Sequence, residues 1–243
     1  MQPGSRVEDY RLFQQRIGTS RVVIVTPAAY VTDNSVTLDA IARLGSQARG
    51  VGVVHPTVTD AELKRMADGG IRGIRFTQYD PRTAATTIDM IEPLAKRVEP
   101  LGWHVQIHLR ADQIAGAADL LQRLPGTIVF DHLGRLPQSA GIDDPAFGVI
   151  RRMLDTGRTW VKLSGAYMMA GPPAYAEAAI VAQAYIEAAP ERMVWGSDWP
   201  HPTENDKPDD AVLFDLLSDW APDAPTRRRI LVDNPAALYD FPK

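Results

Sequence analysis

Short runs of apolar, mostly β-branched residues alternate along this chain with segments whose apolar positions recur at helical spacing. Most of the runs are apolar at nearly every position, as in parallel strands that are covered on both faces. Their starts lie roughly 22 to 33 residues apart, which is the length of one strand–helix unit. The predicted strands are 22–26, 51–55, 73–77, 105–109, 128–132, 160–164 and 193–197.

The segments between these runs predict helices. Segment 60–68 carries Leu63 and Met66 three positions apart on one face, and the pair Gly69-Gly70 predicts its end. The predicted helices are 6–18, 60–68, 86–101, 173–189, 209–220, 226–231 and 235–239. No linker or low-complexity segment interrupts the pattern, so we expect residues 1–243 to form a single domain.

Repeated strand–helix units fold either as a doubly wound sheet or as a (β/α)₈ TIM barrel. A nucleotide-binding doubly wound sheet would carry G-x-G-x-x-G after its first strand, whereas residues 26–30 read Thr-Pro-Ala-Ala-Tyr. The sequence therefore predicts an α/β fold of the TIM-barrel type. Seven parallel strands are recognisable, so we expect barrel strand 1 to be missing, since it would have to precede Arg6.

Composition excludes several classes of site and partner. The 243 residues contain no cysteine, which excludes disulfides, a thiolate nucleophile and cysteine-ligated metals. The formal net charge of −4 argues against nucleic acid as a partner. No run approaches the ~18 apolar residues that a membrane span needs. Because the N-terminus lacks the apolar core of a signal peptide, we expect a cytoplasmic protein.

Polar residues gather where the predicted strands end, which is where a barrel places its active site. His108 and His132 lie at two strand ends, and Asp198 follows the last strand. An aspartate there can act as a general base, and a histidine can polarise a carbonyl oxygen. Arg75 and Arg135 can bind carboxylates. These residue types predict hydrolysis at a carbonyl group of an anionic small molecule.

Each candidate also has a structural interpretation. His132 could be a buried histidine bonded to a carbonyl, Asp198 could cap a turn, and the arginines could form surface ion pairs. His104 lies near the start of its strand, which favours a structural role. For His55, which Pro56 follows directly, the structural interpretation is also favoured. Lys162 lies in an apolar strand and therefore needs a buried partner.

Several motifs resemble those of one enzyme group. They are G-I-R-G-I-R-F at 70–76, G-W-H-V at 102–105, D-H-L-G-R at 131–135, V-K-L-S-G at 161–165, W-G-S-D-W-P-H at 195–201 and D-N-P-A at 233–236. Together they cover nearly the whole chain and resemble the amidohydrolase superfamily, specifically its amidohydrolase-2 branch. Within that branch the chain is most similar to the 2-pyrone-4,6-dicarboxylate lactonases and related muconolactone-type hydrolases.

The resemblance implies a TIM-barrel hydrolase and a role for individual residues. Asp198 would activate the hydrolytic water, and His132 would assist at the carbonyl. His108 and Asp198 would be the ligands of a divalent metal, with Zn²⁺ the ion that a His/Asp set favours. The implied substrate-binding residues are Arg75, Arg135, Arg82, Ser164 and His201.

The sequence departs from the family at its front, because family members open with an H-x-H motif and this chain has no histidine before His55. That departure puts metal binding in doubt. Three explanations stay open: a reading frame that starts upstream, a natural barrel that only binds a small anion, and a second chain, as in a homodimer, that fills the gap. We favour the first.

The sequence therefore predicts a hydrolase that directs water onto a lactone or cyclic ester bearing carboxylate groups. The alternatives are a metal-dependent decarboxylase of the same branch and a non-catalytic barrel.

Overall fold

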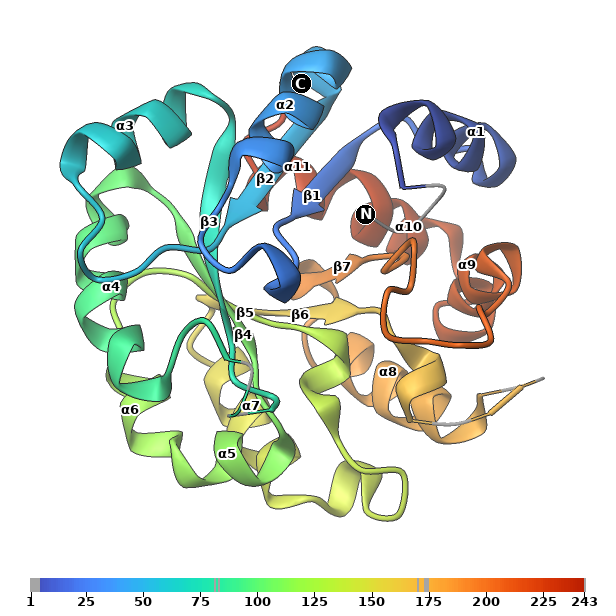
Figure 1. Cartoon of the computed structure of the whole chain (residues 1–243). Helices are drawn as coiled ribbons and strands as arrows, with labels where there is room; N and C mark the ends of the chain where they lie inside the picture. Colours follow the sequence, from blue (N-terminus) through green and yellow to red (C-terminus); the bar gives the residue numbers. More distant parts are fainter. Residues whose placement is uncertain (1–4, 81, 83, 170, 173–174, 243) are drawn as a thin grey trace.

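The computed structural model describes residues 5–80, 82, 84–169, 171–172 and 175–242. Seven strands form one sheet, all neighbours are parallel, and the order of the strands is their order in the chain. Figure 1 shows this sheet curled into an incomplete barrel with helices around its outside. The strands are β1 Val22–Val25, β2 Ala48–Gly52, β3 Ile71–Thr77, β4 His104–His108, β5 Ile128–Phe130, β6 Thr159–Leu163 and β7 Met193–Trp195. The predicted α/β barrel type and the seven parallel strands are confirmed.

The sheet has two free edges among the described residues, because β1 pairs only with β2 and β7 only with β6. A cavity of about 330 Å³ lies between these edges. Val23 and Val25 line it from β1, Trp195 lines it from β7, and Lys162 from β6 reaches it from within the barrel. The seven strands therefore surround the barrel interior without closing it at this point.

Helices cover the outer face of the sheet (Figure 1). They are α1 Val7–Ile17, α2 Ser35–Leu44, α3 Asp60–Asp68, α4 Ile91–Val98, α5 Ala111–Gly116, α6 Ala118–Arg123, α7 Pro145–Leu154, α8 Ala176–Ala188, α9 Asp210–Trp220, α10 Ala224–Arg228 and α11 Asn234–Leu238. The 3₁₀ turns are Ala28–Tyr30, Gly45–Gln47, Ile88–Met90, Glu99–Leu101, His132–Arg135, Gly141–Asp143, Ala166–Met168 and Pro190–Arg192, and a π turn spans Arg229–Asp233. Thr59 and Asp209 cap α3 and α9 by accepting hydrogen bonds from their first turns.

The predicted strand 51–55 was placed too late in the chain. β2 begins at Ala48 and ends at Gly52, so His55 is an exposed residue beyond the strand and not a strand end. Val53 and Val54 are buried, which explains the apolar run. However, the N–H and C=O of Val53 bond to the side chain of Asn34 and not to a neighbouring strand.

Four helices were not predicted: α2, α5, α6 and α7. Helices α5 and α6 have six residues each, too few for a helical period to be visible. In α2 only Thr37 and Ile41 are buried, so its apolar stripe is short. The predicted helix 86–101 begins at Ile88 as a 3₁₀ turn. Of predicted helix 173–189, positions 173 and 174 lie outside the described residues, and α8 begins at Ala176.

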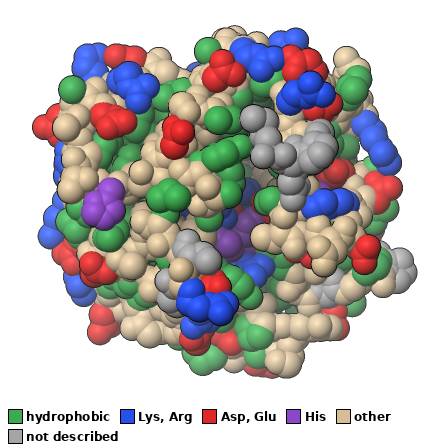
Figure 2. All heavy atoms as spheres, viewed as in Figure 1, with side chains coloured by type: hydrophobic (Ala, Val, Ile, Leu, Met, Phe, Trp, Pro, Cys, Tyr) green, Lys and Arg blue, Asp and Glu red, His purple; other side chains and the backbone are tan. Residues whose placement is uncertain are grey.

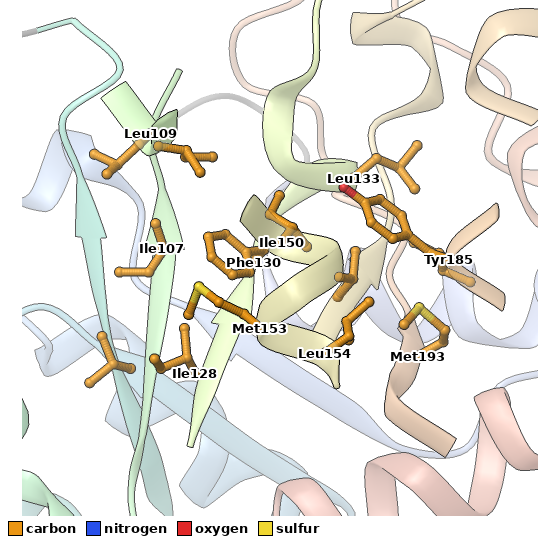
Figure 3. Packing of buried hydrophobic residues seen from close by; sticks show 14 of the residues in the cluster. Ile107, Leu109, Ile128, Phe130, Leu133, Ile150, Met153, Leu154, Tyr185 and Met193 are labelled. Atoms are coloured by element: carbon orange, nitrogen blue, oxygen red, sulfur yellow. The ribbon is translucent and has the colours of Figure 1, made fainter. Parts of the chain in front are cut away.

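The main core lies between the outer faces of the strands and the helices. Figure 3 shows Ile107 of β4 and Phe130 of β5 directed toward Ile150 and Met153 of α7. All four side chains are almost fully buried. In β4 the apolar residues alternate with polar ones that point into the barrel, because successive side chains of a strand face opposite sides.

His104 fills the base of the barrel, as its structural interpretation predicted. Its ring lies edge-on to Tyr239, with centroids 5.3 Å apart, and 1% of the residue is exposed. Gly73 pairs with His104 across β3 and β4, and a Cβ at Gly73 would lie 2.3 Å from the imidazole ring. Position 73 must therefore be glycine for this ring to fit.

No helix in the described ranges is long and apolar enough to cross a membrane.

Asn34 holds the carboxyl ends of β1 and β2 together. Its Oδ1 accepts hydrogen bonds from Thr26 Oγ1 and from the N–H of Val53, both at 2.9 Å. Its Nδ2 donates to the carbonyl oxygens of Val53 at 2.8 Å and of Thr32 at 3.0 Å. One buried side chain thus satisfies backbone groups that leave the sheet beside its free edge.

We predict that Asn34→Ala lowers the free energy of unfolding by about 2–4 kcal/mol, because several buried polar groups lose their partners. Chemical denaturation followed by circular dichroism measures the change. The control is Val36→Ala in the first turn of α2, just after Asn34, where the side chain is 42% exposed, and it should shift stability by less than about 0.5 kcal/mol. Equal effects of the two substitutions would contradict the role of Asn34.

Candidate active site

The predicted site residues come together at the carboxyl ends of β3 to β7, apart from Arg82 and His201, which are described below. Figure 2 shows a hollow near the middle of this face, with histidine side chains and Lys or Arg atoms at its floor. The turns that carry these residues follow the strands directly, so the positions of the side chains are set by the sheet.

Asp131, directly after β5, is the charged centre of the floor. Its side chain is 0% exposed, and its Oδ2 lies 2.7 Å from Arg75 Nη2 of β3. Its Oδ1 lies 3.0 Å from Lys162 Nζ of β6. Gln106 of β4 donates a hydrogen bond to Oδ2 at 2.9 Å. Lys162 thus has the buried partner that its position in the sequence required.

Asp131 is ionised despite its burial. Burial alone would raise the pKa of Asp131, but His132, Lys162 and Arg75 favour the charged form and hold the pKa well below its usual range. The result is a fixed negative charge that is compensated by two fixed positive charges.

His132 lies beside this cluster with one ring nitrogen held. Its Nδ1 is 3.0 Å from Ser164 Oγ at the end of β6. Its Nε2 faces Arg75 Nη2 at 3.5 Å, Asp131 Oδ2 at 3.7 Å and Asp198 Oδ1 at 3.8 Å. Burial lowers the pKa of His132 to about 4, although both carboxylates oppose that shift. The imidazole is therefore neutral at pH 7.

Asp198 approaches from the loop after β7. Its backbone φ is 63°, a left-handed conformation that non-glycine residues adopt rarely. Its Oδ2 accepts a hydrogen bond from Tyr167 Oη at 2.6 Å. Burial opposes the ionisation of Asp198, but His132, Lys162 and Tyr167 together leave its pKa below the ordinary value. Asp198 is therefore a carboxylate at neutral pH.

His108 forms a wall of the hollow. Its ring stacks on Tyr79 at 5.8 Å and lies edge-on to His132 at 5.0 Å. Neither ring nitrogen has a hydrogen-bond partner in the described part of the chain. Burial, with Arg75 and His132 nearby, holds the pKa of His108 well below its usual range. Arg135 also lies over the ring of Tyr79, with its guanidinium carbon 4.1 Å from the ring centroid.

Two predicted substrate-binding residues have other contacts. The side chain of Arg82 is 88% exposed, and its Nη2 pairs with Asp80 at 2.8 Å. The side chain of His201 is 2% exposed, and its Nε2 lies 2.9 Å from Asp210 Oδ1. His201 also lies edge-on against Tyr167, with centroids 5.1 Å apart. Their roles in substrate binding stay predictions.

Sequence reasoning assigned no site role to Tyr79 or Tyr167. Tyr167 follows the V-K-L-S-G motif. Its position just beyond a strand end was the only feature of the sequence that could have marked it as a site residue. Tyr79 lies two residues beyond β3, and nothing in its spacing distinguishes it.

The donor set for a metal is incomplete. No three His, Asp or Glu side chains among the described residues lie close enough together to hold an ion. His132 and Asp198 face each other, but Arg75 already supplies a positive charge 3.5 Å from His132 Nε2. The described residues thus do not fit the predicted zinc ion, and His108 and Asp198 as its ligands stay a prediction.

Comparison with known proteins identifies the family. Residues 2–241 match the family model described as amidohydrolase. The chain belongs to the amidohydrolase family. The resemblance drawn from the sequence motifs is therefore confirmed.

Named relatives of this amidohydrolase act on lactones. It is 36% identical to a 4-sulfomuconolactone hydrolase of Rhizobium radiobacter, over 98% of this chain and 81% of the relative. It is 35% identical to a 2-pyrone-4,6-dicarboxylate hydrolase of Comamonas testosteroni, over 97% of this chain and 80% of the relative. A D-galactarolactone isomerase of Agrobacterium fabrum is 31% identical, over 96% and 80% respectively.

Solved structures show the same fold. A protein from Agrobacterium tumefaciens superimposes with a TM-score of 0.90 at 30% identity, covering 97% of this chain and 84% of the other. A protein from Acinetobacter baumannii, described as a probable 2-pyrone-4,6-dicarboxylic acid hydrolase, has a TM-score of 0.84 at 26% identity, with 98% and 90% coverage. An amidohydrolase from Burkholderia multivorans with bound zinc is 18% identical (TM-score 0.78; 97% and 88% coverage), so that likeness concerns the fold alone.

We predict that the imidazole of His132 takes up its proton near pH 4, because burial disfavours the charged ring. The unfolded chain takes up this proton near pH ~6.5, so the amidohydrolase should lose stability as the pH falls from 6.5 toward 4. NMR titration of the histidine ring signals, assigned with His132→Gln, measures the midpoint. A midpoint at the ordinary value of histidine would contradict the buried, neutral state.

Proposed function

We propose that this amidohydrolase hydrolyses a lactone that carries an anionic substituent. The observation that carries the proposal is the pair formed by Asp198 Oδ1 and His132 Nε2, which face each other at 3.8 Å on the floor of the hollow. A carboxylate and a neutral imidazole at this separation can act on a water and on a carbonyl oxygen at the same time. The named relatives support the lactone as substrate class.

The ionised Asp198 accepts a proton from water while the water oxygen attacks the lactone carbonyl carbon. His132 Nδ1 lies 3.0 Å from Ser164 Oγ. In the tautomer that carries the ring proton on Nε2, Ser164 Oγ donates to Nδ1, and Nε2 donates a hydrogen bond to the carbonyl oxygen. Negative charge grows on that oxygen in the transition state, where the nearby guanidinium of Arg75 stabilises it. The C–O bond of the ring then breaks, and its oxygen takes the proton that Asp198 received.

The anionic substituent binds at the positively charged part of the hollow. Arg75 is committed to Asp131, and its side chain is 11% exposed. Arg135 lies above Tyr79 at the edge of the site and has no carboxylate partner among the described ion pairs. Arg135 is therefore the arginine better placed to bind a carboxylate or sulfonate. The proposed binding partner is thus the small anionic substrate.

Three further predictions from the sequence remain predictions: that the protein forms a homodimer, that it is cytoplasmic, and that it is a single domain.

A lactone isomerase is a second candidate, because one relative at 31% identity has that name. It starts from the same substrate class but returns a lactone, whereas hydrolysis opens the ring. A decarboxylase, the alternative from the sequence, releases CO₂. The products therefore separate the three reactions.

We predict that the wild-type protein opens 4-sulfomuconolactone or 2-pyrone-4,6-dicarboxylate, and that Asp198→Asn lowers kcat by about 10²- to 10⁴-fold through loss of the base. Loss of the ring chromophore and release of acid measure the rate. Asp215→Asn, an exposed carboxylate on α9, is the matched control and should retain full activity. Full activity of Asp198→Asn would remove Asp198 from the mechanism.

We also predict that a chelator leaves the rate unchanged, because the described residues do not assemble three metal ligands and Arg75 already lies beside His132. The measurement compares initial rates before and after EDTA treatment and desalting, with metal content determined on the same samples. A loss of activity that zinc restores would show that a metal takes part.

A further inference from the structure

The loop that carries Asp198 is held by two side chains that follow this residue in the chain. Trp199 stacks on Phe13 of α1 with ring centroids 5.8 Å apart. His201 is tied to Asp210 of α9 by its Nε2 at 2.9 Å. These contacts hold in place the backbone that directly follows Asp198. They do not fix the rotation of its carboxylate, which depends on what its two oxygens contact.

Tyr167 contacts one of those oxygens. Its Oη donates to Asp198 Oδ2 at 2.6 Å, a short hydrogen bond with a charged acceptor. The ring of Tyr167 is itself held edge-on by His201 at 5.1 Å, with the planes at 85°. Burial, followed by the charge of Asp198, raises the pKa of Tyr167 above its ordinary value of 10. The hydroxyl therefore keeps its proton and acts as a donor.

The two oxygens of Asp198 are thus unequal. Oδ2 is engaged by Tyr167, whereas Oδ1 faces His132 Nε2 at 3.8 Å, which is too far for a direct hydrogen bond. A water bound at Oδ1 would lie on the side of the carboxylate where His132 can reach the substrate carbonyl. A rotated carboxylate would lose this alignment.

We propose that Tyr167 is a positioning residue for lactone hydrolysis: its hydroxyl holds Asp198 Oδ2 so that Oδ1 alone receives the proton of the attacking water. This role rests on the proposed function. It adds Tyr167, which had no role in the sequence analysis, to the residues that act in the hydrolysis. Tyr167 acts through Asp198 and need not touch the substrate.

The substitution Tyr167→Phe removes the hydroxyl and keeps the ring against His201. It should lower kcat by about 10- to 100-fold, the effect of one hydrogen bond to a charged group, and leave KM nearly unchanged. Tyr185→Phe is the matched control, because the buried hydroxyl of Tyr185 has no hydrogen-bond partner among the described residues. It should keep both constants, and thermal melts should show both variants folded. Equal kcat of Tyr167→Phe and wild type would overturn the proposal.

A double-mutant cycle separates positioning from a general structural effect. If Tyr167 acts only through Asp198, adding Tyr167→Phe to Asp198→Asn causes no further loss of kcat. Losses that multiply would show an independent role and overturn the proposal.

Failure of the proposed function would look different, because the wild type would then open no lactone. In that case a crystal structure of Tyr167→Phe tests the positioning directly. The carboxylate of Asp198 should rotate away from its wild-type orientation, and an unchanged carboxylate would overturn the proposal.

Discussion

The site depends on the buried charge of Asp131. A carboxylate that is 0% exposed is tolerated only when it is paired and hydrogen-bonded, and here Arg75, Lys162 and Gln106 provide that compensation. These three partners come from β3, β6 and β4, while Asp131 follows β5. One ionic cluster therefore links the carboxyl ends of four adjacent strands. It also places a guanidinium beside His132, where the proposed reaction develops negative charge.

Unusual backbone conformations give the catalytic pair its geometry. His132, Leu133, Gly134 and Arg135 have φ values of 47°, 54°, 76° and 53°, and Asp198 has 63°. Such conformations are costly for residues with a Cβ, so the surrounding packing must stabilise them. Leu133 is fully buried, and a Cβ at Gly134 would lie 2.4 Å from Ile150 Cδ1. Packing against α7 thus holds the turn that aims His132 at Asp198.

Sequence patterns predicted the strands, the family and the convergence of His108, His132 and Asp198. Apolar periodicity and the order of motifs can be read directly from the amino-acid sequence. They could not show that Arg75 forms an ion pair with Asp131. The sequence would be the same if Arg75 bound the substrate instead. Nor could they find Tyr167, whose role depends on a 2.6 Å contact between loops 31 positions apart. The end of β2 was misplaced for a related reason: Val53 is buried, but a side chain and not a strand satisfies its backbone.

In the proposed reaction, water attacks a lactone carbonyl on this floor of charged residues. Turnover in H₂¹⁸O followed by mass spectrometry of the product tests it most directly. The product should be a ring-opened acid that carries one ¹⁸O in the newly formed carboxylate, with no release of CO₂. An unlabelled product that is still a lactone, or a product that has lost CO₂, would contradict it.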